Sequence, residues 1–217
     1  MINSSANRWS VSIQTFAKKA RNDNMEHVNT SFQMILDTTE ELIREKGCRQ
    51  TTLQDIISKT GLSKGAIYHY VTGKDELLGL VLKARIEQMN ANFHEVVNNP
   101  TSQGLENPLQ LIATGIAQTS HHEDVTNKIF IYLLSQMDNP KVSDIMKGVY
   151  QYTLNTCVQW IEVGQQSGVI PPTVEKVKVA EGMLMFMYGL RVQNTIRQEA
   201  GSMNMQDMMQ FMFRSLQ

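Results

Sequence analysis

The residues best suited to contact another molecule are hydroxyl, small, basic and aromatic side chains gathered within a dozen positions: Ser63, Lys64, Gly65, Ala66, Tyr68, His69, Tyr70 and Lys74. On a helix, at about 100° per residue, one side carries Ile67, Tyr70 and Val71, and the other carries Lys64, Gly65, Tyr68 and His69. One side can therefore pack against the protein while the other meets a DNA groove. Lysine neutralises phosphate, and small residues let a helix lie deep in a major groove about 12 Å wide.

Two short helices around a turn, over residues 52–71, would position these side chains. The Thr52 hydroxyl can cap the Asp55 amide while the Asp55 carboxylate reaches back, which is a capping-box arrangement. Gly61 tolerates the positive φ of a sharp turn, and Ser63 provides a second N-cap. Leu53, Ile56 and Ile57 form one apolar face. This pattern is typical of a DNA-reading helix-turn-helix, and the structural alternative is a helical hairpin with an exposed Tyr-His pair.

Three further features favour DNA as the partner. Gly65 costs roughly 1 kcal/mol relative to Ala in a helix interior, a cost that makes sense if the backbone must approach another molecule closely. Ala66 can contact a thymine methyl group. Lys74 begins the next helix, where outward-pointing amides and the positive charge together form a phosphate site.

Residues 35–82 resemble the DNA-binding domain of the tetracycline-repressor (TetR) family of bacterial transcription regulators. The most specific stretches are residues 61–70 and 74–78. The resemblance implies that Thr52 and Lys74 contact phosphates, that residues 63–66 meet bases or backbone, and that residues 68–70 fix the helix against the strand. Val71 stands where many members carry Phe, and Thr60 where Ala is frequent. Both are changes in packing that affect docking detail rather than the assignment.

Composition predicts an all-α protein. The chain has 217 residues, of which 41% are hydrophobic, and its five prolines accompany long stretches of helical period without alternating strand patterns. We expect an N-terminal extension (1–30), a three-helix helix-turn-helix domain (31–76, motif 52–71) and a C-terminal helical ligand-binding and dimerisation domain (77–217). The last domain should contain helices over residues 105–119, 125–137, 142–167 and 173–200, with residues 183–190 buried on nearly every side.

Charge and cysteine usage are consistent with a reduced cytoplasm and a DNA partner. The net charge is −1, but the first 85 residues contain 12 Lys and Arg against 9 Asp and Glu, whereas the remainder contains 8 against 12. Cys48 and Cys157 form no C-x-x-C pattern, so neither a disulfide framework nor a zinc knuckle is predicted. No apolar run is long enough to cross a bilayer, and we expect a soluble, cytoplasmic protein.

The first 30 residues leave three interpretations open. They combine basic residues with apolar positions of helical spacing: Arg8, Lys18, Lys19 and Arg21 beside Trp9, Ile13, Phe16 and Ala17. This extension could be a basic arm for the minor groove or an added partner-binding helix. It could also be a mobile tail, with translation starting at Met25.

Family resemblance implies that the last two long helices pair with their copies in a homodimer. A single recognition helix reads few base pairs, whereas two-fold pairing at about 34 to 36 Å places two helices in successive grooves. We therefore expect a palindromic operator in double-stranded DNA. Near the C-terminus, an apolar stripe of Met205, Met208, Met209, Met212 and Leu216 must also be covered by other parts of the protein.

A small hydrophobic or cationic ligand would lie in the C-terminal domain. The candidate residues are Phe130, Leu134, Met137, Tyr152, Trp160, Met183, Met187 and Tyr188. The simpler interpretation is that methionine, which is flexible, fills the core and the dimer seam. Trp160 beside Glu162 could hold an organic cation against its ring face. Residues 121–124 (His-His-Glu-Asp) cannot converge on one ion from a helix, so we expect a capped helix break rather than a metal site.

The sequence therefore predicts a homodimeric transcription regulator, most simply a repressor released from its operator by a ligand. We expect no catalytic residues and no cofactor, because no nucleophile, phosphate-loop or paired-carboxylate pattern occurs. Two alternatives stay open: a constitutive or nucleoid-associated DNA-binding protein, and a helical partner-binding protein without DNA recognition. Operator, ligand and regulated genes are not encoded in any motif.

Overall fold

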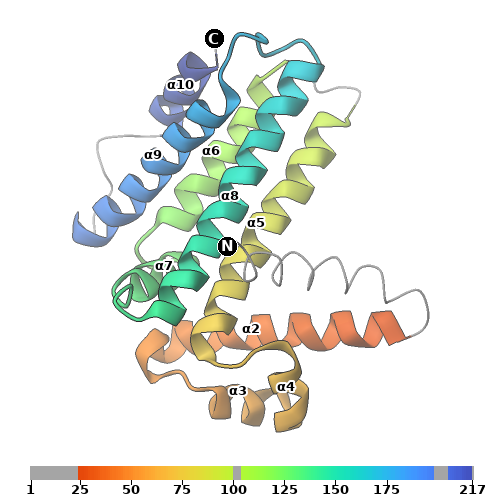
Figure 1. The fold of residues 1–217 in the computed structure, drawn as a ribbon, viewed down its shortest axis with the longest axis vertical. Coiled ribbons are helices and arrows are strands. Elements are labelled where there is room, and N and C mark those ends of the chain that lie inside the picture. Colours follow the sequence, from red (N-terminus) through yellow and green to blue (C-terminus); the bar gives the residue numbers. More distant parts are fainter. Residues whose placement is uncertain (1–23, 100–103, 198–204, 217) are drawn as a thin grey trace, which may run out of the picture.

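The chain folds as a small helical domain beneath a larger bundle of longer helices (Figure 1). The computed structural model describes residues 24–99, 104–197 and 205–216. Within these ranges every regular element is a helix, so the all-α prediction is confirmed. The helices are α2 (Asn24–Gln50), α3 (Leu53–Thr60), α4 (Lys64–Tyr70), α5 (Lys74–Val97), α6 (Glu106–Ser120), α7 (Val125–Leu134), α8 (Pro140–Gln166), α9 (Lys176–Arg197) and α10 (Met205–Ser215).

The small domain consists of α2, α3 and α4, and its helix ends follow the predicted signals. Gly47 interrupts α2 with φ 78°, a conformation that a side chain rarely adopts. The capping box at the start of α3 is present, and Gly61 ends α3 in the left-handed conformation with φ 69°. Ser63 caps α4. Local hydrogen bonding therefore fixes the helix-turn-helix geometry before any distant packing is considered.

The first hydrophobic core joins the small domain to the bundle. Buried side chains of α2, α3 and α4 contact those of α5, α7 and the start of α8. Leu77 and Leu78 of α5 are fully buried in this core, and Val81 is 1% exposed. The boundary expected at residue 76 thus lies within α5, and packing is continuous across it.

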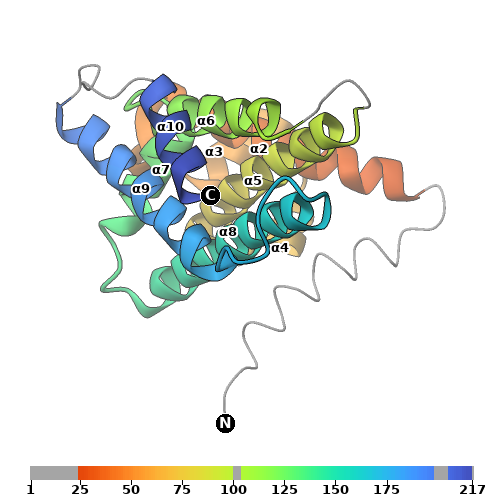
Figure 2. The same ribbon diagram turned by 90° about the horizontal axis from the view of Figure 1, so that it is seen from above.

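The second core fills the upper bundle, between α5, α6, α8, α9 and α10. Figure 2 shows α10 lying across α6, and the two helices are in contact. Met208, Met212 and Leu216 are buried there, so the predicted cover for the C-terminal stripe is confirmed for these three residues. Met205 lies outside the described side chains.

The prediction that residues 183–190 are buried on nearly every side is wrong for the single chain. Met183 and Leu184 are buried, but Met185 is 70% exposed and Gly189 is also exposed. The reason is that α9 packs on α8, α6 and α7 along one side only. Helix ends differ slightly from expectation as well: α9 spans Lys176–Arg197 rather than residues 173–200, and α7 stops at Leu134.

Two expectations concern other parts of the chain. The basic and apolar positions of residues 8–21 lie outside the described residues. In the parts that are described, no helix combines the length and the apolar character needed to cross a bilayer.

The contact of α5 with α8 provides a test of the packing. Gly79 lies where a Cβ would come within 2.5 Å of Ile145 Cγ2. Gly79→Ala should therefore lower the free energy of unfolding by about 1–3 kcal/mol, the usual cost of overpacking. Urea unfolding at fixed protein concentration measures this change.

Gly148→Ala in α8 is the matched control. Its Cβ would meet only Lys83 Nζ, at 4.0 Å, so the substitution should be neutral or stabilise the helix by about 0.5–1 kcal/mol. Wild-type stability of the Gly79 variant would contradict the close approach of α5 and α8.

Candidate functional site

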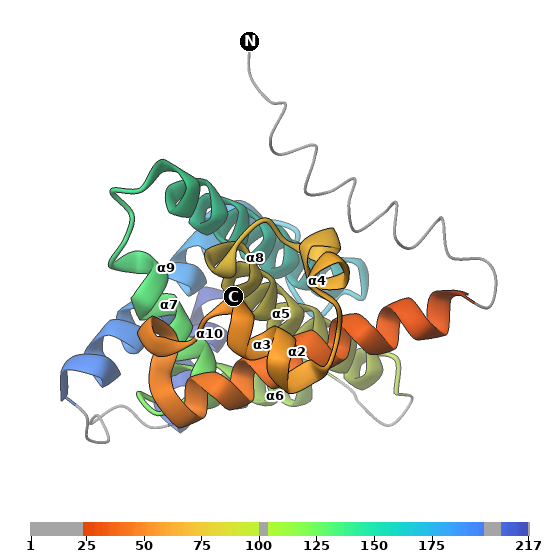
Figure 3. The ribbon, with the colours of Figure 1, turned by 90° about the horizontal axis from the view of Figure 1, so that it is seen from below.

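The face predicted to meet DNA is open on α4. Tyr68 is 46% exposed, and Lys64, Gly65 and His69 are exposed beside it. On the opposite side, Ile67 and Val71 are buried in the first core. Viewed from below, α3 and α4 lie at the free end of the molecule (Figure 3). The two-sided character expected of a recognition helix is therefore present.

Two hydroxyl groups of the motif are used as helix caps. The Thr52 hydroxyl accepts from the Asp55 amide at 3.2 Å and donates to Asp55 Oδ2 at 2.7 Å. A phosphate contact from this hydroxyl would therefore compete with the cap. Ser63 Oγ accepts from the Ala66 amide at 3.1 Å, which leaves its own proton to donate outward.

Tyr70 is the residue that braces α4 against α2. It is half-buried, with its ring centroid 5.2 Å from that of Phe32 and 5.4 Å from that of His69. Burial raises the pKa of Tyr70. Of the two tyrosines, Tyr68 therefore has the more accessible ring, whereas much of Tyr70 is used in holding the helix.

Most basic side chains of the small domain are already paired with carboxylates. Lys59 binds Glu41 and Glu45, each at 2.9 Å. By contrast, Arg49 and Lys64 form no ion pair with any described residue, and both are exposed. Arg49, at the end of α2, was not among the residues predicted from the sequence. The sequence feature that could have identified it is a basic residue immediately before the motif.

Lys74 is held more tightly than the sequence suggests. Its Nζ donates to the Cys48 carbonyl at 2.9 Å and lies 5.0 Å from the ring centroid of Tyr132. An ammonium group has three donors, so a phosphate contact requires one of the other two. Direct phosphate binding by this residue stays a prediction.

One ion pair links the small domain to the bundle. Arg85 of α5 binds Glu40 of α2, and Glu40 also accepts from Arg44 at 2.9 Å. The Glu40 side chain is only 10% exposed, whereas the side chains of Arg85 and Arg44 are 47% and 57% exposed, so solvent partly screens both pairs. The orientation of α2 is therefore tied electrostatically to α5.

A cavity of about 70 Å³ lies inside the bundle, between α5, α6, α7, α8 and α9. Five of the eight predicted ligand residues line it: Phe130, Trp160, Met183, Met187 and Tyr188. Arg85 lines it as well, and so does Arg191, which the sequence analysis missed. The sequence feature that could have identified Arg191 is the presence of an arginine within the apolar stretch of α9.

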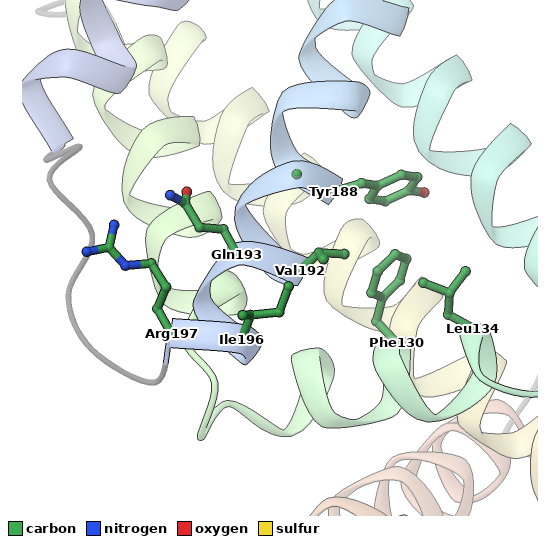
Figure 4. Close-up of a pocket in the computed structure, with 8 residues that line it drawn as sticks. Phe130, Leu134, Tyr188, Val192, Gln193, Ile196 and Arg197 are labelled. Atoms are coloured by element: carbon green, nitrogen blue, oxygen red, sulfur yellow. The ribbon is translucent and has the colours of Figure 1, made fainter.

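The other three predicted ligand residues lie elsewhere. Leu134 lines a shallow surface groove between α7 and α9 (Figure 4). Met137 is exposed after α7, and the Tyr152 hydroxyl donates to Glu87 at 3.2 Å. Neither residue lines the cavity.

The geometry around Trp160 gives no support to an organic cation. Its indole N–H donates to Asn90 Oδ1 at 2.7 Å, and its ring stacks on Phe93 with centroids 5.2 Å apart. The carboxylate of Glu162 is paired with Lys176. Both groups expected to attract a cation are therefore already engaged.

Residues 121–124 form the predicted helix break. Asp124 caps α7 by accepting from the Thr126 amide at 2.8 Å. His122 Nε2 lies 3.5 Å from Glu123 Oε1, and Glu123 also pairs with Lys128. The lysine contact lowers the pKa of Glu123. In the described part of the chain, no cluster of His, Cys, Asp and Glu has metal-binding geometry.

Sequence comparison matches residues 35–81 to the family described as bacterial regulatory proteins, tetR family. The HTH-type transcriptional repressor KstR2 of Mycobacterium tuberculosis is 26% identical over 95 residues, which are 44% of this chain and 47% of that protein. The chain thus spans about half the length of this curated relative. The fatty acid metabolism regulator protein of Bacillus subtilis is 22% identical over 163 residues, covering 74% of this chain and 80% of the relative.

Structural comparison extends the similarity to the whole fold. The solved structure of Salmonella enterica GusR superposes with a TM-score of 0.60 at 19% identity, over 90% of this chain and 98% of that chain. At this level of identity the comparison concerns the fold alone.

The Asp55 carboxylate gives a pH-dependent test of the motif. Hydrogen bonds from Lys46 and then from Thr52 lower the pKa of Asp55 from 3.8 to about 2. Because the pKa of Asp55 is lower in the folded chain than in the unfolded chain, its charge stabilises the fold at any pH above the unfolded pKa. This stabilisation is lost as the pH falls from about 4 to about 2. Asp55→Ala should therefore unfold at a lower temperature than wild type at pH 7, and the difference should vanish in acid. Circular dichroism melting at a series of pH values measures it.

Asp144→Ala is the control for this experiment, because Asp144 forms only an exposed pair with Lys147 at 3.7 Å. Its effect should be small at every pH. A difference between wild type and the Asp55 variant that persists unchanged at pH 2 would show that the carboxylate does not stabilise the fold through its charge.

Proposed function

We propose that this chain, which belongs to the tetR family of bacterial regulatory proteins through residues 35–81, is a sequence-specific DNA-binding regulator that represses transcription. The observation that carries the proposal is the exposed polar face of α4, presented at the free end of the molecule on a capped helix-turn-helix. The family consists of regulators rather than enzymes, and we place the protein in the cytoplasm with its DNA.

Three features of the motif support contact with DNA. Arg49 and Lys64 have positive charges that no described carboxylate neutralises, so they are available to phosphates. Ser63 retains a donor beside them. An added Cβ on Gly65 would meet only Ser63 Oγ, at 3.9 Å. Packing within the chain therefore gives no reason for a glycine at position 65, whereas close approach to a groove does.

A homodimer would present two such faces to a palindromic operator. The free side of α9 is apolar: Met185 is 70% exposed, Val192 38% and Ile196 76%. Their spacing of seven and eleven residues from Met185 places them on one stripe of the helix. Such a stripe, together with α8 beside it, fits a two-fold interface between copies of this chain.

Ligand control would pass through α5. This helix forms part of the cavity wall through Arg85 and also packs against the recognition domain through Leu77 and Leu78. A ligand that fits only a rearranged cavity would move α5, and with it α2 through the Arg85–Glu40 pair. Such a ligand shifts the operator-bound population only by the difference in its affinity for the two arrangements.

Gly65→Ala separates folding from DNA binding. Because α4 gains helix propensity without an internal clash, the free energy of unfolding should rise by about 0.5–1 kcal/mol. Binding to a DNA fragment selected from a random pool by the wild-type protein should nevertheless weaken by about 10-fold, or about 1.4 kcal/mol. Gel retardation at fixed salt and urea unfolding provide the two readouts.

Glu95→Gln, an exposed change on α5 away from the motif, should alter neither readout. Full retention of specific binding by the Gly65 variant would contradict close approach of α4 to the groove. Failure of the wild-type protein to select any sequence would overturn the proposed function.

The dimer is tested by placing a charge on the α9 stripe. Wild-type protein should sediment at twice the 24.6 kDa chain mass, and Met185→Asp should sediment as a monomer because the interface would bury an unpaired carboxylate. Met34→Asp is the matched control, since Met34 is also an exposed methionine, at 41%, but lies on α2. A dimeric Met185 variant would exclude this face of α9 as the interface.

A further inference from the structure

Arg191 is a cation buried in the wall of the central cavity. It lies on α9, is 8% exposed, and donates from Nη1 to the Thr126 carbonyl at 3.2 Å. Its guanidinium carbon is 5.2 Å from the ring centroid of Phe130. Burial lowers the pKa of Arg191 to about 10, so the side chain still carries its charge at neutral pH.

The described part of the chain gives Arg191 no paired counter-ion. No described carboxylate forms an ion pair with Arg191, and its Nε has no hydrogen-bond acceptor. The charge of the Asp124 carboxylate acts on Arg191 and raises its pKa, but this carboxylate caps α7 and forms no ion pair with the guanidinium. A buried charge without a partner destabilises a fold, and retaining one is understandable where a partner arrives from outside.

Arg85 shows what a satisfied arginine looks like in the same cavity. It also lines the wall, but its side chain is 47% exposed and is bound to Glu40. Of the two arginines that line the cavity, Arg191 is the one that is buried and that forms no ion pair with a described carboxylate. A negative charge from a ligand would therefore be placed best beside Arg191.

The remaining wall is mostly apolar, with four threonines among its side chains, and it is adaptable. Met89, Ile112 and Met183 line it together with Trp160, whose polar group is already bonded. At about 70 Å³ the cavity is smaller than the roughly 300–1,000 Å³ typical of ligand pockets. Flexible methionine side chains can swing aside to enlarge it. Met89 is one such side chain, and it fills the space against Gly115.

The internal cavity and the surface groove of Figure 4 share a wall of two stacked rings. Phe130 and Tyr188 line both spaces, with ring centroids 4.8 Å apart. Because the groove also includes Val192 and Ile196 of the proposed dimer stripe, a ligand in the cavity would lie close to the interface.

We propose that the cavity binds a carboxylate with an apolar body, the carboxylate against the Arg191 guanidinium and the body among the methionines and Trp160. Arginine matches a carboxylate in shape as well as in charge. This ligand class rests on the proposed function, because it would be the effector of the regulator. A carboxylate ligand takes the place of the cationic ligand that Trp160 and Glu162 led us to expect from the sequence.

Three ten-carbon probes that differ only in their head group test the proposal: decanoate, decanol and decylamine. Trp160 lines the cavity. The other tryptophan of the chain, Trp9, can be replaced by phenylalanine so that fluorescence reports Trp160 alone. In this background decanoate should change the emission and bind more tightly than decanol, and decylamine should bind weakest. Arg191→Met should weaken decanoate by about 10- to 100-fold, the loss expected for a hydrogen bond to a charged group, and leave decanol unchanged.

Arg214→Met, which removes an exposed arginine from α10, should leave decanoate affinity unchanged. Circular dichroism melting of Arg191→Met checks that it is folded, and Arg191→Lys, which keeps the charge, should retain more decanoate affinity than Arg191→Met. Equal affinities for decanoate and decanol, tighter binding of decylamine, or no decanoate binding would each overturn the carboxylate site.

The same proteins tested on a selected DNA fragment separate the two proposals. If the protein binds DNA but does not respond to decanoate, the proposed regulatory function stands and the proposed carboxylate ligand is wrong. If it binds decanoate but retards no DNA, the carboxylate site stands and its role as an effector site is wrong.

Discussion

Helix α5 contributes buried side chains to both hydrophobic cores, and this sharing makes the two halves of the chain one mechanical unit. At its start, Leu77 and Leu78 are enclosed by the small domain, and near its end Phe93 is enclosed by the upper bundle. Packed interiors respond to displacement by shifting as blocks rather than by deforming smoothly. The direction in which α4 points is therefore set by the helices that surround the cavity.

Electrostatics reinforces this connection. Glu40 pairs with both Arg85 and Arg44, so α2 is bound to α5 by an ion pair as well as by apolar contact. Arg191, on the cavity wall formed by α9, has no carboxylate partner among the described residues. The two arginines that line the cavity therefore differ: Arg85 joins α5 to α2, and Arg191 is left for a ligand.

Local features of this fold were predictable from the sequence because they depend on neighbours within four residues. The Thr52–Asp55 cap, the left-handed Gly61 and the buried side of α4 follow from hydrogen bonding and period alone. Contacts between distant segments were not predictable in this way. Lys74 binds a carbonyl 26 positions earlier, and the surroundings of Arg191 are set by helices that no local pattern brings together.

If α4 enters duplex DNA as one of a symmetric pair, hydroxyl-radical footprinting of the full chain on a selected DNA fragment should show two protected segments on one face of the duplex. These segments should be related by a dyad and centred about 34–36 Å apart. A single protected segment, or uniform protection without a dyad, would contradict the symmetric pair.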